Sequence, residues 1–373
     1  MPITLPAHSP RTRSLTEVVP EMFRSLQGEG TWLRPARSVV LVMLDGVGAA
    51  QVRARSGHAR FLASLAGARD IARTTFPSTT ASALTSLLTA TDPGEHGMLG
   101  YRIRVPDTGR VANLLHGWED GELPEDWQRS SPLTRAQSQR APVFVLSKPD
   151  FATTGFTRAT TDGAEFIGVS DLDERIARAG AVAAQHPGSF TYLYVPELDG
   201  IGHRSGWESG AWTDQLERVD AALRDLARAA PQAGVVITAD HGMIDVPAGR
   251  HVLLDDGDPR LEGVADIAGE PRMLHLYTQP QAADAVAGVW RAADADRAWV
   301  MTRDEAVTAG VFGSVSPAVA ARIGDVLVAA RARVAYYDNR VDDRSPQRMV
   351  GQHGSLTLEE SVVPLLRAGA YAD

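Results

Sequence analysis

Cysteine is absent from the 373 residues of this sequence. This absence excludes disulfide bonds, thiolate metal sites and cysteine nucleophiles together. Any metal ion would therefore be held by His, Asp, Glu or a hydroxyl oxygen. The redox compartment is left open.

Long apolar runs and an excess of positive charge are also missing. No eighteen apolar residues stand together, and the opening MPITLPAHSPRTRSL has no apolar run after its start,. We therefore expect a cytoplasmic protein without a membrane segment. The formal net charge of -9 argues against long nucleic acids as partners, because non-specific binding to the phosphate backbone requires clustered Lys and Arg.

Three similar apolar segments stand out in an otherwise ordinary globular composition. They are SVVLVMLDG at 38–46, FTYLYVPELDG at 190–200 and GVVITADHG at 234–242. Short β-branched apolar runs of this kind predict strands that are buried on both faces. Each run ends in an acidic residue next to a glycine or histidine.

Helical patterns lie between these strands, at residues 81–90, 172–186 and 212–230. The alternation predicts an α/β fold with a mostly parallel central sheet and helices on both faces. Ligands of such sheets bind beyond the carboxyl ends of the strands. The acidic residues of the three segments are expected at that edge.

The chain is expected to begin with an N-terminal extension, residues 1–35, which contains a short helix around 15–26. The main domain is expected over 36–373. Within it, the turn-rich segment from about 246 to 350 predicts a smaller inserted α+β subdomain. The motif GQHGSL at 351–356 is then expected to return the chain to the main sheet.

Three carboxylates and three imidazoles stand at these predicted strand ends and loops. They are Asp45, Asp199, His203, Asp240, His241 and His353. Singly, such an Asp is more often a helix cap or a turn residue. Together, six oxygen and nitrogen donors suit two zinc-type ions, which can activate a nucleophile and stabilise the oxygens of an in-line phosphoryl displacement.

A candidate nucleophile lies in the Thr/Ser-rich turn after Pro77, ahead of the helix predicted at 81–90. A hydroxyl there meets the free N–H groups of the helix N-terminus, which favour bound phosphate. Ser and Thr before a helix are usually only N-caps. The turn alone therefore does not identify a catalytic group.

The motifs MLDG, PSTT, PGEHG, ELDGIGH, TADHGM and QHGS occur in one order along the chain. This order resembles that of the nucleotide pyrophosphatases and phosphodiesterases of the alkaline phosphatase superfamily. The resemblance implies an alkaline phosphatase-like catalytic domain with two divalent metal ions, Zn²⁺ being expected and Mn²⁺ or Fe possible. It implies two ligand sets, one of Asp199, His203 and His353 and the other of Asp45, Thr80, Asp240 and His241.

The resemblance also implies a threonine nucleophile. The family motif usually reads Thr-Phe-Pro-Asn, and this chain has TFPS at 75–78, which makes Thr75 a rival. Counting back from Thr89 and from the PGEHG turn favours Thr80. His96 in that turn is interpreted as structural.

The implied activity is that of a metal-dependent phosphodiesterase or nucleotide pyrophosphatase with a covalent phosphothreonine-type intermediate. A small phosphodiester or nucleotide-like molecule is the expected substrate, and the segment Tyr101–Phe156, rich in aromatic residues, is expected to shape its leaving-group pocket. The alternatives are a phosphomonoesterase or phosphonate hydrolase of the same superfamily and, from another class, a noncatalytic metal-stabilised binding protein. Other histidines are expected at the surface or in packing, although His251 and His275 could approach the substrate.

Overall fold

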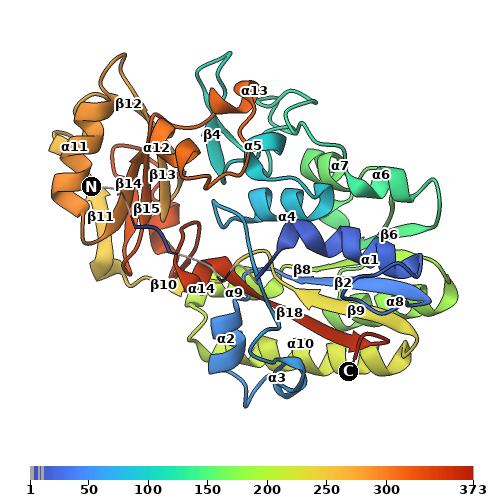
Figure 1. Ribbon diagram of the computed structural model, residues 1–373. Coiled ribbons are helices and arrows are strands. Elements are labelled where there is room, and N and C mark those ends of the chain that lie inside the picture. The colour runs from blue at the N-terminus through green and yellow to red at the C-terminus, as the bar shows by residue number, and fades with distance from the viewer. Residues whose placement is uncertain (1–3, 7–8, 10–11, 373) are drawn as a thin grey trace.

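The computed structural model describes residues 4–6, 9 and 12–372 (Figure 1). No helix in this part of the chain is both long and apolar enough to cross a membrane.

An eight-stranded sheet forms the centre of the molecule. Its order is β1-β3-β18-β9-β2-β8-β6-β7. The strands are β1 (Arg13–Ser14), β3 (Ile71–Arg73), β18 (Val362–Gly369), β9 (Ala233–Thr238), β2 (Ser38–Leu44), β8 (Phe190–Val195), β6 (Val143–Ser147) and β7 (Glu165–Gly168). Every pairing is parallel except the two that β18 makes, so the mostly parallel α/β sheet predicted from the sequence is confirmed.

The three strands predicted from apolar runs, β9, β2 and β8, are neighbours at the middle of this sheet. All seven residues of β2 are buried, as expected for a strand covered on both faces. Because Met43 pairs with Thr238 and Leu44 with Val195, the carboxyl ends of these strands meet at one edge. The residues that follow them share that edge.

Helices cover both faces of the sheet. Figure 1 shows α1 and α4 on one face and α10 with α3 on the other. Outside the segment 246–350, the helices are α1 (Val18–Leu26), α2 (Ala49–Ala54), α3 (Arg60–Leu65), α4 (Thr80–Thr89), α5 (Pro93–His96), α6 (Leu133–Gln137), α7 (Gly155–Thr161), α8 (Leu172–Gln185), α9 (Glu197–Ser205), α10 (Gly210–Ala229) and α14 (Leu358–Ser361). The helices predicted at 81–90, 172–186 and 212–230 correspond to α4, α8 and α10, with ends within two residues of expectation.

The segment between residues 246 and 350 builds a second, antiparallel sheet. Its order is β12-β13-β15-β14. The elements here are β11 (His251–Leu254), β12 (Val264–Glu270), β13 (Met273–Thr278), α11 (Ala283–Asp294), β14 (Ala298–Thr302), α12 (Arg303–Thr308), α13 (Pro317–Ala320), β15 (Val326–Ala330) and β16 (Ala335–Asp338). A separate cluster of buried apolar side chains, which includes Trp290 and Tyr336, packs on this sheet.

Two short strands mark where the chain leaves and rejoins the main sheet. β10 (Ile244–Asp245) pairs antiparallel with β17 (Gly351–Gln352). The loop after β17 therefore lies beside the loop that follows β9, although more than a hundred residues separate them. Outside these regions, β4 (Arg102–Arg104) and β5 (Val111–Asn113) form a small hairpin.

Candidate active site

Asp45 and Asp240 follow the neighbouring strands β2 and β9 and are both buried. Oδ1 of Asp240 accepts hydrogen bonds from the N–H of Gly46 (3.1 Å) and of His241 (2.9 Å). Its Oδ2 has no hydrogen-bond partner, and neither has Oδ1 of Asp45. Two buried carboxylate oxygens are thus left without donors at the sheet edge.

Helix α9 carries Asp199 and His203 one turn apart, which places them on the same helix face. His203 Nε2 lies 3.4 Å from Asp199 Oδ1, and this carboxylate oxygen also lacks a hydrogen-bond donor. Gly46 allows α9 to approach β2, because it has φ of +73° and a Cβ there would lie 2.9 Å from Asp199 Oδ1. A side chain at Gly46 would displace the carboxylate.

The three histidines of the site share one hydrogen-bonding pattern. Nδ1 of His203 faces the carbonyl oxygen of Gly351 (2.8 Å), Nδ1 of His353 that of Ser78 (2.9 Å), and Nδ1 of His241 that of Gly242 (3.1 Å). A carbonyl oxygen only accepts, so each Nδ1 carries a proton, and in the neutral imidazole the lone pair is then on Nε2. This is the tautomer that a metal ligand requires.

The free donors form two groups. One contains Asp45, Asp240 and His241, and the other contains Asp199, His241 and His353, the ligand atoms of each lying within 4.8 Å of one another. His203 joins the second group, since its Nε2 is 3.3 Å from that of His353. The resemblance to the family implied that His241 belongs to the first group alone. In the structure its ring stacks on that of His353, with 3.6 Å between the ring centroids, so His241 belongs to both groups.

Burial and mutual repulsion determine the electrostatics of these groups. Burial raises the pKa of Asp45 well above its usual range, and the charges of Asp240 and Asp199 raise it further. Burial, with His241 and His203 nearby, lowers the pKa of His353 well below that of a free histidine. Crowded carboxylates, neutral imidazoles and unpaired oxygens fit two divalent cations, since bound positive charge would relieve this repulsion.

Tyr194 supports the first group and was not singled out from the sequence. Its hydroxyl donates to Oδ2 of Asp45, which leaves only Oδ1 of that carboxylate free. Such a partner fixes the orientation of a metal ligand. Tyr194 stands two residues after Tyr192 on β8, so the period of a strand puts both on one face, but nothing in the sequence says which face meets Asp45.

Thr80 is the first residue of α4, and its hydroxyl oxygen lies 3.3 Å from Nε2 of His241. The preceding Thr79 is the N-cap and is buried. The rival Thr75 turns its hydroxyl to the carbonyl oxygen of Pro77, 3.4 Å away. Of these two threonines, Thr80 is the one whose hydroxyl lies beside a histidine of the donor groups.

A cavity of about 280 Å³ opens beside Thr80, Asp45 and Asp199. Its wall is mostly apolar or hydroxylic, and the residues that line it include Leu84, Leu88, Val145, Phe151, Phe156, Phe166, Thr157 and Thr160. None of the described residues on this wall is a lysine or an arginine. An uncharged group attached to the phosphate would fit here.

The aromatic segment expected to shape the pocket contributes only in part. Phe151 and Phe156 line the cavity, while Trp127 is buried beneath Arg322, whose guanidinium carbon lies 3.6 Å from the ring centroid. Tyr101 is 40% exposed and does not line the cavity. His116, expected at the surface, is exposed but does line the cavity.

His96, from the PGEHG motif, and His275 are buried and belong to neither group of donors. His96, the last residue of α5, is fully buried against α4, with Nε2 2.8 Å from Ser86 Oγ, and burial together with Arg322 lowers its pKa to about 3. His275 is also buried, 3.0 Å from the carbonyl oxygen of Leu99, and its pKa falls to about 4. The suggestion that His275 approaches substrate is therefore not supported by its contacts.

The strand ends of this α/β sheet thus gather two groups of carboxylate and imidazole donors that could hold metal ions, beside the hydroxyl of a helix N-terminus. A family model described as type I phosphodiesterase / nucleotide pyrophosphatase matches residues 39–356. The chain belongs to this family, whose members are phosphoester hydrolases. No match was found among curated proteins.

Solved structures show the same fold. An inactive form of murine ectonucleotide pyrophosphatase/phosphodiesterase 5, with threonine replaced by alanine and AMP bound, superposes with a TM-score of 0.68 at 17% identity, over 89% of this chain and 88% of that one. Phosphonoacetate hydrolase from Sinorhizobium meliloti 1021 in complex with phosphonoacetate gives 0.68 at 18% identity, over 90% and 91%.

Proposed function

We propose that this protein hydrolyses small phosphodiesters with two divalent metal ions and with Thr80 as the nucleophile. The observation that carries the proposal is the position of the Thr80 hydroxyl, 3.3 Å from Nε2 of His241 at the start of α4. The murine relative that is inactive carries a threonine-to-alanine substitution, which supports a threonine-dependent reaction in this fold.

Two ions at the donor groups would lower the pKa of the nucleophile and neutralise charge on the phosphate. The first set of ligands is Asp45, Thr80, Asp240 and His241, and the second is Asp199, His203 and His353. Zn²⁺ suits this set of oxygen and nitrogen donors, and Mn²⁺ or Fe is also compatible with it.

The reaction proceeds in two displacements. Thr80 Oγ attacks phosphorus and loses its proton to water, while the bond between phosphorus and the leaving ester oxygen breaks. That oxygen takes a proton from water and departs with its substituent. The free N–H groups at the N-terminus of α4 stabilise negative charge on the phosphate oxygens. Water then attacks the phosphothreonine-type ester, the Thr80 oxygen leaves and is reprotonated, and the two inversions retain configuration at phosphorus.

The cavity supports diesters over monoesters. A monoester dianion has an additional charged oxygen, and the described residues on the cavity wall offer no Lys or Arg to pair with it. A diester carries an alkoxy group instead, which the side chains of Phe151, Phe156 and Leu84 can contact. Discrimination follows because an unpaired charge in an apolar cavity is costly.

A phosphonate hydrolase is the second candidate, since phosphonoacetate hydrolase shares the fold. The carboxylate of a substrate such as phosphonoacetate would require a cationic partner. The same shortage of cations on the cavity wall therefore makes the diesterase the better candidate.

The test compares kcat/KM for 4-nitrophenyl phosphate, bis-4-nitrophenyl phosphate, 4-nitrophenyl thymidine phosphate and phosphonoacetate on one metal-loaded preparation. We expect the two diesters to be preferred. A monoester preference of tenfold or more, about 1.4 kcal/mol of transition-state binding, would assign the protein to the phosphomonoesterases. Two bound metals with no turnover of any phosphoester would favour the noncatalytic binding protein.

A further inference from the structure

A buried ion pair joins the antiparallel sheet to the loop that carries His353. Arg272 lies in the turn between β12 and β13, and its guanidinium donates to both carboxylate oxygens of Glu360 on α14, at 2.7 Å and 2.8 Å. Both side chains are fully buried. The three other N–H groups of Arg272 donate to the carbonyl oxygens of residues 330, 332 and 334, so all five of its donors are used.

Glu360 contacts the two loops that carry His353 and His241. Its Oε1 accepts from the N–H of Ser355 at 3.0 Å, and its Oε2 accepts from the hydroxyl of Thr357 at 2.6 Å. Its backbone carbonyl accepts from the N–H of Gly242 at 2.9 Å, directly after His241. The loops of two metal ligands are thus held by one residue.

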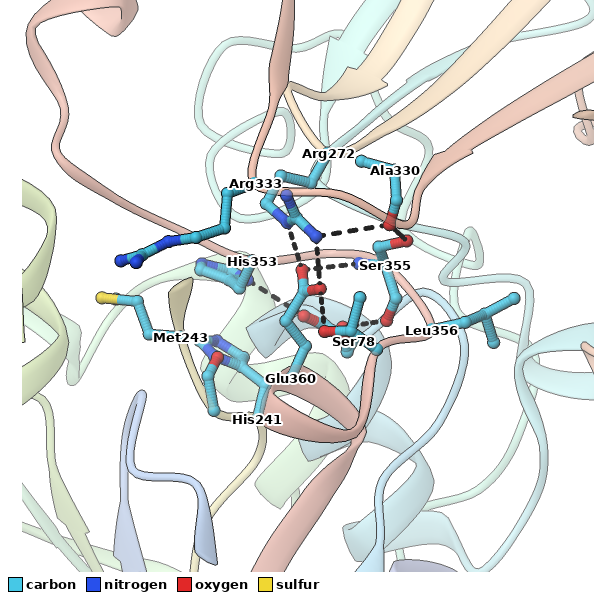
Figure 2. A network of polar contacts seen from close by, with 12 residues as sticks. Ser78, His241, Met243, Arg272, Ala330, Arg333, His353, Ser355, Leu356 and Glu360 are labelled. Atoms are coloured by element: carbon cyan, nitrogen blue, oxygen red, sulfur yellow. Dashed lines mark hydrogen bonds and ion pairs between the residues drawn. The ribbon is translucent and has the colours of Figure 1, made fainter. Parts of the chain in front are cut away.

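Ser355 extends these contacts to the turn before the nucleophile (Figure 2). Its hydroxyl donates to the carbonyl oxygen of Ala330 at 2.6 Å, and its own carbonyl accepts from the Ser78 hydroxyl at 2.7 Å. The Ser78 carbonyl accepts from Nδ1 of His353 at 2.9 Å. Ser78, which stands two residues before Thr80, also pairs with Gly354 in an isolated antiparallel bridge.

We propose that the Arg272–Glu360 pair is a positioning unit. It fixes the imidazole of His353 and the hydroxyl of Thr80 in position relative to each other. This inference rests on the proposed function, in which His353 binds metal and Thr80 attacks phosphorus. Neither Arg272 nor Glu360 is in the ligand set; both act through Ser355 and Ser78. The antiparallel sheet is thereby part of the active site's framework.

The test uses Arg272→Met and a matched control, Arg260→Met. Arg260 also makes a two-fold contact with a carboxylate in the same part of the chain, that of Asp258 at 2.6 Å and 3.0 Å, and a further pair with Asp294 at 3.1 Å. Among the described residues, its side-chain hydrogen bonds, ion pairs and ring contact all remain within residues 246–350. Metal affinity is measured by competition with a chelator, alongside kcat, KM and Tm.

We expect Arg272→Met to weaken the binding of one of the two metal ions by about 10- to 100-fold, the usual effect of losing a supporting contact to a ligand. The value of kcat should fall by a similar factor, with little change in KM. Arg260→Met should lower Tm but retain wild-type metal affinity and kcat. Ser78→Ala, which breaks only the contact with Ser355, should give a smaller loss of metal affinity in the same direction.

If Arg272→Met does not fold, the double variant Arg272→Met with Glu360→Gln removes both buried charges, which avoids an unpaired carboxylate, and the same losses are expected. Wild-type metal affinity and kcat in the Arg272 and Ser78 variants, with a fall in Tm like that of Arg260→Met, would overturn the positioning role alone. A wild-type protein that binds no metal would overturn the proposed function and this inference with it.

Discussion

At the scale of single residues, backbone carbonyls determine what the site histidines can do. Each carbonyl oxygen opposite an Nδ1 holds the ring so that Nε2 faces the other donors of its group before any ion binds,. The motifs predict these imidazoles, but the partners Gly351 and Ser78 follow from the pairing of β10 with β17 and from a loop contact, which local pattern does not reveal.

Replacing Thr80 by alanine tests the nucleophile. Thr80→Ala should lower kcat by several orders of magnitude while fold and metal content are nearly retained, because the covalent step is removed and one weak ligand is lost. Thr75→Ala is the control and should be mild, since that hydroxyl faces the Pro77 carbonyl. The measurement is single-turnover kinetics of both variants, with circular dichroism to check folding.

A reversed order of effects, with Thr75→Ala inactive and Thr80→Ala active, would show that the assigned register is wrong. Mapping the peptide labelled by a trapped substrate gives an independent answer.

At the scale of elements, periodicity located the central strands and the long helices. β2, β8 and β9 are buried runs, and α4, α8 and α10 end close to their predicted limits. The order of the strands in the sheet and the antiparallel entry of β18 were not predicted. Nor was the Arg272–Glu360 pair, because 88 residues separate its members and no short-range pattern links them.

His96 connects two of these elements and makes stability depend on pH. Its pKa is about 3 in the folded protein, below the unfolded value of about 6.5. Between these two pH values the unfolded state binds more protons than the folded state, so the free energy of unfolding rises with pH. The contribution of His96 to it is fully present above about pH 6.5 and is lost as the pH falls toward 3.

His96→Gln removes this proton uptake. The slope of the unfolding free energy against pH should therefore be lower in the variant by up to about 1.4 kcal/mol per pH unit. Urea unfolding of wild type and variant at several pH values from 4 to 7, with chelator present in both, measures the difference in slope. Equal slopes would mean that the folded protein accepts the proton at His96.

At the scale of the whole molecule, the metal ions would complete the structure as well as the chemistry. Elemental analysis of pure protein is expected to give about two zinc-class ions per chain, and chelation should abolish activity and lower Tm. Without the ions, Asp45 has a raised pKa, so the stability it contributes to the metal-free protein is present below its usual pKa and is lost as pH rises through the raised value.

The measurement is Tm against pH for metal-loaded and metal-free protein, with zinc added back as the control. The Tm of the metal-loaded protein should be higher than that of the metal-free protein, and the difference in Tm should grow as pH rises through the raised pKa of Asp45. A metal-free preparation that keeps full activity would contradict the two-metal mechanism.

The position of β18 has a consequence for how the protein is made. Residues 362–369 are inserted between β3 and β9 rather than added at an edge of the sheet. Until they are synthesised, β3 and β9 lack the strand that joins them. At about 5–20 residues per second, β9 waits on the order of ten seconds for its neighbour. During that interval its unpaired backbone groups are open to other chains. The sheet therefore cannot close before residues 362–369 have left the ribosome, and until then the nascent protein depends on whatever shields the free edge of β9.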